Sequence, residues 1–183
     1  MRMFLAVLGV VLLGSVVACA NGLGFFGSYW DTKDADSDWG GGAKLQLEII
    51  PNVFVEARGT YFPEFGEKSG DEVKVDIIPV EADAILKFPI ADQFKLYGGG
   101  GAGYYIFNVK NDVDDVDIEV DNELGYFAVA GVEIALSEQV SLFAEGKYTW
   151  LDTTTTAKFE GVEEKQDDSL DGFGGVAGIM LTF

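Results

Sequence analysis

A set of charged residues lies inside runs that are otherwise apolar, where charge is least expected. Ion pairing is the chemistry open to them, because an isolated buried ion carries a desolvation penalty of several kcal/mol. Arg58 is the predicted hub, since its fork suits bidentate contacts with carboxylates. We expect one cluster of ion pairs formed by Lys44, Glu48, Glu56, Arg58, Glu81, Asp83, Lys87, Glu133, Glu145 and Lys147.

A second group of acidic residues is interleaved with Val and Ile between positions 112 and 123. Two interpretations are open: a solvated face of like charges, or a weak site for divalent cations. The sequence has no Gly at the sixth position of the run, so it does not fit an EF-hand. The alternation instead predicts a hairpin that continues the following strand. The candidate metal ligands are Asp112, Asp114, Asp115, Asp117, Glu119 and Asp121.

The composition separates charge from apolar content along the chain. Among the 183 residues, Lys and Arg total 12 against 31 Asp and Glu, for a formal net charge of −19. No basic stripe is available to neutralise phosphates, which argues against nucleic acid as a partner. A hydrophobic fraction of 48% argues against disorder.

The first 20 residues have the three parts of a secretory signal peptide. A short basic region at Met1–Met3 precedes the apolar run Phe4–Val17 and the small-residue site Ala18–Ala20. We expect cleavage after Ala20, leaving one domain at residues 21–183. The run Val16–Cys19 also resembles a lipobox, so a lipoprotein with a soluble β-domain is an alternative.

The rest of the chain alternates between apolar runs of strand period and acidic, turn-rich stretches. Strands of about 9–11 residues can cross a bilayer when tilted. The expected strands are Gly22–Trp30, Gly41–Ile50, Val53–Phe62, Val73–Phe88, Phe94–Val109, Leu124–Leu136, Val140–Leu151 and Gly172–Phe183.

The connections between these strands alternate in length. Short turns are expected at 51–52, 89–93 and 137–139, and long loops at 32–40, 63–72, 110–123 and 152–171. Short periplasmic turns and long external loops are typical of membrane barrels. The sequence therefore predicts an all-β fold: an eight-stranded antiparallel up-and-down transmembrane β-barrel.

Within the expected strands, the charges keep to one face. Ala82 and Ala84, for example, alternate with Glu81 and Asp83. A Lys or Arg on the lipid face would cost about 2–4 kcal/mol at the bilayer midplane. The apolar face should therefore meet lipid, and the charged face should line the lumen.

Two irregular stretches need an interpretation. The apolar parity changes across Ile78-Pro79, which predicts a β-bulge that shifts the strand by one residue. The glycines at 98–101 and 103 lack a following Gly-Lys-Ser/Thr, so a phosphate-binding loop is not predicted. Small side chains in a curved strand of a narrow barrel are the expected explanation.

The final strand alternates apolar residues up to a terminal aromatic: Phe173, Ile179, Leu181 and Phe183 share one face. This pattern resembles the closing strand of small eight-stranded outer-membrane proteins, the OmpX/Ail type and the barrel domain of OmpA. The OmpW type, with its apolar lumen, fits less well because the predicted lumen is charged.

The resemblance implies a bacterial outer-membrane location and contact with lipid and lipopolysaccharide. It also implies that Phe183, Leu181 and Ile179 form the signal read by the barrel-assembly machinery. If the acidic loops bind divalent cations, these ions are expected to bridge to lipopolysaccharide phosphates. Small outer-membrane enzymes depend on a His, and this chain has none, so no enzyme and no cofactor are expected. The expected role is structural or surface interaction, with a narrow porin-like pore for small solutes as the alternative.

Overall fold

The computed structural model describes residues 21–33, 37–63, 73–111, 117–120, 122–159 and 162–183. The predicted signal peptide, with Cys19, lies outside these residues. The strands are β1 (Gly22–Thr32), β2 (Asp38–Ile50), β3 (Val53–Tyr61), β4 (Val73–Ala91), β5 (Phe94–Asn111), β6 (Asp117–Val120), β7 (Glu123–Ala135), β8 (Val140–Trp150), β9 (Asp152–Phe159), β10 (Val162–Ser169) and β11 (Gly172–Thr182).

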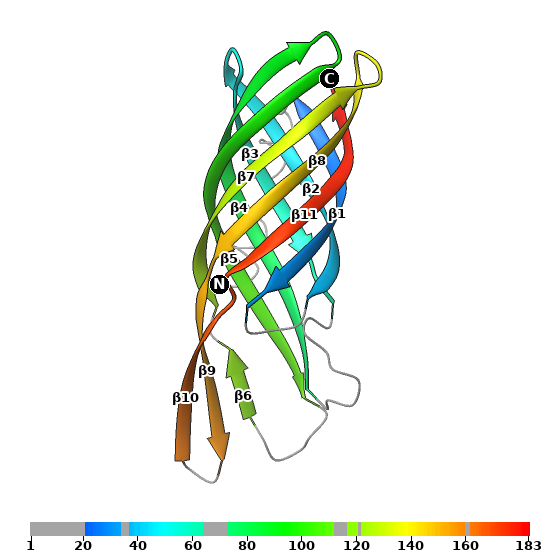
Figure 1. Ribbon diagram of the computed structural model, residues 1–183. Helices are drawn as coiled ribbons and strands as arrows, with labels where there is room; N and C mark the ends of the chain where they lie inside the picture. The colour runs from blue at the N-terminus through cyan, green and yellow to red at the C-terminus, as the bar shows by residue number, and fades with distance from the viewer. Residues whose placement is uncertain (1–20, 34–36, 64–72, 112–116, 121, 160–161) are drawn as a thin grey trace, which may run out of the picture.

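Eight of these strands form a closed antiparallel barrel in the order β1-β11-β8-β7-β5-β4-β3-β2 (Figure 1). The last strand closes it on the first, with Gly22 opposite Thr182 and Thr32 opposite Gly172. Each other strand pairs with its neighbours in the chain, apart from the inserted β6, β9 and β10. The predicted up-and-down barrel is confirmed.

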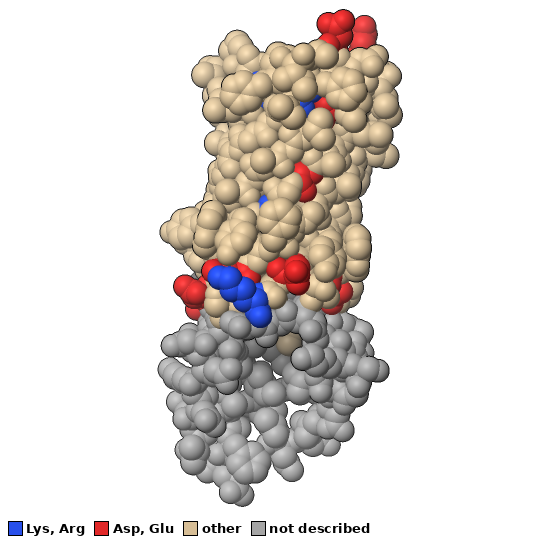
Figure 2. Space-filling view, viewed as in Figure 1, with Lys and Arg blue, Asp and Glu red and all other residues tan. Residues whose placement is uncertain are grey.

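Side chains alternate between the outside and the inside of the barrel along every strand, as the pleat requires. On β11, Phe173 and Ile179 are exposed while Val176 and Met180 are buried. The outer wall is therefore apolar, and Figure 2 shows little charge on its visible face except at the two ends.

Two bands of large exposed apolar side chains border this wall, as expected for the two membrane interfaces. We call the barrel end with the long connections the loop end, and the opposite end, with the chain's C-terminus, the turn end. The loop-end band contains Trp39, Tyr61, Tyr104, Tyr126, Trp150 and Phe173, and the turn-end band contains Ile49, Ile50, Phe88, Ile90, Phe94, Leu136 and Phe183. Within the described residues there is no helix of the length and apolar character needed to cross a membrane.

The predicted β-bulge at Ile78-Pro79 is wrong. Strand β4 keeps one register against β5 from Val73 to Pro89 and shifts only between Pro89 and Ala91. Ile77 and Pro79 both face inward, so the inward face turns apolar there while its parity is unchanged.

Proline has a different effect at this position: it interrupts pairing with β3. The ladder runs to the pair Gly59–Val80, stops, and resumes in the same register at the bridge Phe62–Ile77. The backbone groups of Ile77 point toward the β3 side, where they exchange hydrogen bonds with Phe62. Backbone groups two residues apart point to the same neighbouring strand, so those of residue 79 also point toward β3. Because Pro79 lacks an N–H, it cannot donate there.

The described part of the third loop, β6, does not pair with β7, the strand that the predicted hairpin would continue. β6 pairs instead with β9, and β9 pairs with β10, giving a second sheet of order β10-β9-β6. This sheet extends beyond the loop end of the barrel (Figure 1) and joins the third and fourth loops. We call it the loop sheet.

Candidate functional site

Glycines on β5 make room for charged side chains inside the barrel. Gly101 and Gly103 are the register partners of Asp83 and Glu81 on β4. A Cβ at Gly101 would lie 2.6 Å from the Cβ of Asp83, and one at Gly103 would lie 2.6 Å from the Cγ of Glu81. The glycine run therefore admits these two carboxylates to a narrow lumen.

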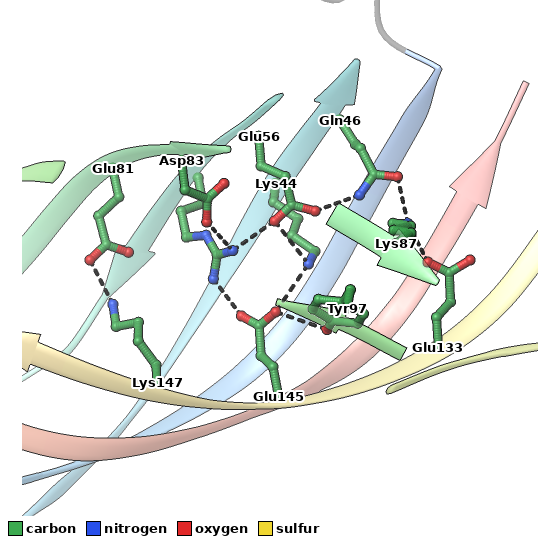
Figure 3. Close-up of polar contacts among 11 residues, drawn as sticks. Lys44, Gln46, Glu56, Glu81, Asp83, Lys87, Tyr97, Glu133, Glu145 and Lys147 are labelled. Carbon is green, nitrogen blue, oxygen red and sulfur yellow. Dashed lines mark hydrogen bonds and ion pairs between the residues drawn. The ribbon is translucent and has the colours of Figure 1, made fainter. Parts of the chain in front are cut away.

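Arg58 on β3 makes the most ion pairs of any lumen residue described, and its partners are Glu56, Asp83 and Glu145, which are labelled in Figure 3. Its Nη2 donates to Glu56 Oε2 at 2.7 Å and to Asp83 Oδ2 at 2.8 Å, and its Nη1 donates to Glu145. Lys44 Nζ lies 3.3 Å from Glu56 Oε2 and 3.4 Å from Glu145 Oε2. All five residues are buried, so each charge has an opposite charge in place of water.

A second part of the network leads from this centre toward the turn end. Gln46 donates to Glu56 and accepts a hydrogen bond from Lys87 Nζ at 2.8 Å. Lys87 also pairs with Glu133, whose other oxygen lies 3.4 Å from Lys95 Nζ. The Lys95 side chain is 43% exposed, so the network reaches solvent at this end.

Toward the loop end, Glu81 forms a separate group. Its Oε1 accepts hydrogen bonds from Lys147 Nζ at 2.6 Å and from the Tyr105 hydroxyl at 2.7 Å. Tyr97 belongs to the central group, where its hydroxyl donates to Glu145 Oε2 at 2.9 Å. Neither tyrosine was assigned a role from the sequence, although both alternate in step with the inward-facing Gly101 and Gly103 of β5.

Aromatic rings also contact the buried cations. Such contacts are worth about 2 kcal/mol when the cation is desolvated. Sequence reasoning assigned these inward aromatics no role. Lys44 Nζ lies 4.0 Å from the centre of the Phe143 ring, Lys87 Nζ 4.7 Å from Phe54, Lys147 Nζ 5.0 Å from Phe127, and Arg58 Cζ 5.7 Å from Phe127.

The lumen is apolar at the loop end, which the charge pattern did not predict. A buried cluster there, called the outer apolar cluster, contains Trp30, Phe62, Ile77, Tyr105, Phe107, Leu151 and Leu170. The Trp30 ring centre lies 5.8 Å from that of Phe62 and 5.9 Å from that of Tyr105. With the bulge that was expected at Pro79, Ile77 would face lipid. For that reason the cluster was not predicted.

Some of the predicted site residues lie elsewhere. Glu48 is exposed at the turn end, where its Oε1 accepts the N–H of Asn52 at 3.2 Å. The described residues hold no group of three or more side chains that could bind a metal. Of the metal candidates, Asp117 and Glu119 lie on β6, and Asp112, Asp114, Asp115 and Asp121 fall outside the described residues.

Asp171 ties the base of the loop sheet to the barrel rim. Its Oδ1 accepts the N–H of Leu151 at 2.9 Å, and its Oδ2 accepts from Lys33 Nζ at 3.0 Å. Burial raises the pKa of Asp171, but these donors outweigh it and hold the pKa below its usual value. The hydrogen bond and charge of Asp171 raise the pKa of Lys33.

Comparison with known proteins agrees with this architecture. Residues 17–180 match the family described as outer membrane protein beta-barrel domain, and the chain belongs to that family. Its location is therefore the bacterial outer membrane, as predicted. Among curated protein sequences, nothing matched.

Solved structures share the fold at low sequence identity. OprG from Pseudomonas aeruginosa superposes with a TM-score of 0.73 at 16% identity, over 90% of this chain and 96% of that one. Neisserial surface protein A gives 0.69 at 14% identity, over 88% and 96%. E. coli outer membrane protein W gives 0.62 at 17% identity, over 90% and 98%.

Proposed function

We propose that this protein is a non-conducting outer-membrane barrel with a structural or surface-interaction role. The lumen network carries the proposal: buried cations and carboxylates from β2, β3, β4, β7 and β8 meet across the barrel. Eight strands enclose a space only about wide enough for side chains. A solute would have to break these buried ion pairs to pass through the lumen.

A second barrier supports the same role. The outer apolar cluster lies between the ion network and the loop end, and its Trp30, Ile77, Tyr105 and Leu151 are at most 3% exposed. Hydrated ions avoid an apolar constriction because they would lose their hydration shell there. Two unlike barriers in series favour a plug over a narrow pore.

The surface part of the proposal rests on the loop sheet. Its outer strand β10 pairs with β9 from Val162–Phe159 to Ser169–Asp152, and no other described strand pairs with β10. A strand with one unpaired edge can accept another strand. The β10 sequence contains Glu163, Glu164, Asp167 and Asp168, which favours a basic partner.

A soluble lipoprotein and an enzyme both have less support. The apolar outer wall and the family match argue against a lipoprotein with a soluble β-domain. Catalysis is not part of the proposal, because the sequence has no His and the lumen carboxylates are engaged in ion pairs.

Ion efflux from lipid vesicles tests the plug with variants that remove one barrier at a time. Arg58→Ser with Glu145→Ser removes the centre of the network, and Trp30→Ala with Tyr105→Ala removes the centre of the outer apolar cluster. We expect no efflux from the wild type, little from either double variant, and rapid efflux from the fourfold variant. Wild-type efflux matching that of the fourfold variant would overturn the plug.

Two controls keep this test interpretable. Trp150→Ala removes an exposed aromatic residue from the outer wall and should leave efflux unchanged. Migration on unboiled SDS gels shows whether each variant has formed a barrel, so that leakage through misfolded protein is recognised.

The remaining partners follow from position and charge. Acidic residues gather at the loop-end rim (Figure 2), where lipopolysaccharide phosphates lie in an outer membrane. We propose that divalent cations bridge these acidic residues and the lipopolysaccharide phosphates. Calorimetry should show heat on adding millimolar Ca²⁺ or Mg²⁺, and no heat would remove the proposal.

The last strand is the proposed contact with the assembly machinery. Phe183 is 68% exposed at the turn end, and its N–H donates to the carbonyl of Asn21 at 3.1 Å. Deleting Phe183 should reduce outer-membrane insertion far more than deleting Glu163 from the loop sheet. Quantifying folded barrel in membrane fractions checks this, and equal insertion of the two variants would contradict it.

A further inference from the structure

The lumen network divides into two groups, and three buried polar atoms lie at the division. The central group contains Arg58 and Asp83, and the loop-end group contains Glu81. Arg58 Nε, Asp83 Oδ1 and Glu81 Oε2 have no hydrogen-bond partner among the described residues. The three residues are 3%, 4% and 2% exposed, so bulk solvent does not satisfy these atoms.

These atoms belong to neighbouring positions. Glu81 and Asp83 are successive inward residues of β4 and lie side by side in Figure 3. Arg58, on β3, is the register partner of Glu81. Its Nη2 donates to Asp83 Oδ2 at 2.8 Å. On the other side of β4, their register partners are Gly101 and Gly103, which have no side chain that could pair with the unpaired atoms.

We propose that one buried water molecule bridges Arg58, Asp83 and Glu81. The unpaired atoms are one N–H donor and two carboxylate acceptors, and a water that accepts once and donates twice complements all three. Buried waters make about three hydrogen bonds. Leaving such atoms buried and unpaired destabilises the folded state, and more so when the group is charged.

Other occupants fit these atoms less well. A Ca²⁺ or Mg²⁺ ion needs about six or more oxygen ligands, whereas two unpaired oxygens are present and the Arg58 guanidinium repels a cation. An anion would face two carboxylates. A water molecule is neutral, so neither the guanidinium nor the carboxylates repel it.

The water would join the two groups into one hydrogen-bonded network. The chain of contacts would then start at Lys95 at the turn end and reach Tyr105 at the outer apolar cluster. Its members in order are Lys95, Glu133, Lys87, Gln46, Glu56, Arg58, the water, Glu81 and Tyr105. The inference rests on the lumen contacts alone, so a conductance result for or against the plug leaves it standing.

A high-resolution crystal structure of the wild-type protein, grown in rubidium bromide, tests the site directly. We expect a solvent peak within hydrogen-bond distance of all three atoms and no anomalous signal there. A rubidium or bromide signal at the site overturns the water, and so does direct pairing of Arg58 Nε with either carboxylate.

A double-mutant cycle gives an independent solution test. Glu81→Gln and Asp83→Asn are made singly and together, and unfolding by urea is followed in lipid vesicles. If a shared water links the side chains, the first change weakens the bridge, because a neutral amide oxygen is a poorer acceptor than a carboxylate. The second change should then lower the folding equilibrium constant by a smaller factor than it does alone.

Repulsion between the two carboxylates predicts the opposite sign, because either single change would relieve it. A double variant less stable than the sum of its singles, or an additive cycle, therefore overturns the bridge. Glu81→Gln with Glu133→Gln is the matched control, and the two should add within about twofold because they lie in different parts of the network.

Discussion

At the scale of single residues, buried cations and carboxylates in the lumen neutralise one another. Arg58 contacts Glu56, Asp83 and Glu145, and Lys44 shares two of these carboxylates. Replacing a whole buried pair by apolar residues is often neutral, whereas removing one partner leaves an uncompensated charge. The network should therefore tolerate paired changes better than single ones.

Arg58→Met tests this directly. It leaves Glu56, Asp83 and Glu145 with fewer cations and should destabilise the barrel by about 3–5 kcal/mol, measured by urea unfolding in lipid vesicles. The control Glu48→Gln changes an exposed carboxylate and should stay within about 0.5 kcal/mol. Equal effects of the two changes would mean that the Arg58 contacts contribute nothing.

The Asp171–Lys33 pair predicts a pH dependence at the rim. Because the pKa of Asp171 is depressed, its stabilising contribution is present above its unfolded pKa of about 4 and is lost as pH falls through the folded pKa. Lys33 has a raised pKa, so its contribution is full below its unfolded pKa of about 10.4 and is lost as pH rises through the folded pKa.

NMR titration of the Asp171 carboxyl carbon checks this pair. The Asp171 midpoint should lie below its ordinary value in the wild type and should rise toward it in Lys33→Met. Lys95→Met, at the opposite end of the barrel, should leave the Asp171 midpoint unchanged. An unchanged midpoint in Lys33→Met would show that the pair does not persist in solution.

At the scale of the strands, the glycines of β5 decide how closely β4 and β5 approach. A Cβ at Gly101 would lie 2.0 Å from the carbonyl oxygen of Ala82. At Gly175, on the outer face of β11, a Cβ would meet nothing within 4 Å. The same substitution should therefore have opposite outcomes at the two positions.

Gly101→Ala should destabilise the barrel by about 1–3 kcal/mol through overpacking. The matched change Gly175→Ala should stay within about 0.5 kcal/mol, since it adds one methyl group to an open surface. Urea unfolding of both variants in the same vesicles compares them. A neutral Gly101→Ala would contradict the close packing of β5 against β4.

The strands and their facing were predictable from the sequence because a period of two persists wherever one side meets lipid. Pro79 misled that reasoning: an apolar inward residue such as Ile77 looks the same as a lipid-facing residue until the register is known. The loop sheet was not predictable, because pairing between β6 and β9 joins two loops far apart in the chain.

Within the site, parity identified most members of the ion network, including Arg58, because charge on one face of a strand can only face the lumen. It could not say which charges meet, since the partners come from different strands and depend on barrel stagger. Nor could it separate Glu48 from the network, because parity carries no information about depth.

At the scale of the whole molecule, the protein has polar groups inside and apolar groups outside, and the cost of a charge should depend on its depth. Ala84 is exposed on the outer wall and Asp92 lies in the turn beyond the turn-end band. Ala84→Arg should cost about 2–4 kcal/mol and Asp92→Arg about 0–1 kcal/mol. Urea unfolding in vesicles measures both, and equal costs would contradict the predicted depth of Ala84.

The central claim about the whole molecule is that its lumen does not conduct. Single-channel recording of the purified wild-type protein in planar bilayers tests it most directly, with the Arg58, Glu145, Trp30 and Tyr105 fourfold variant as the open reference. The structure predicts a flat baseline for the wild type and discrete openings for the fourfold variant. Stable, reproducible conductance steps from the wild type would contradict the claim.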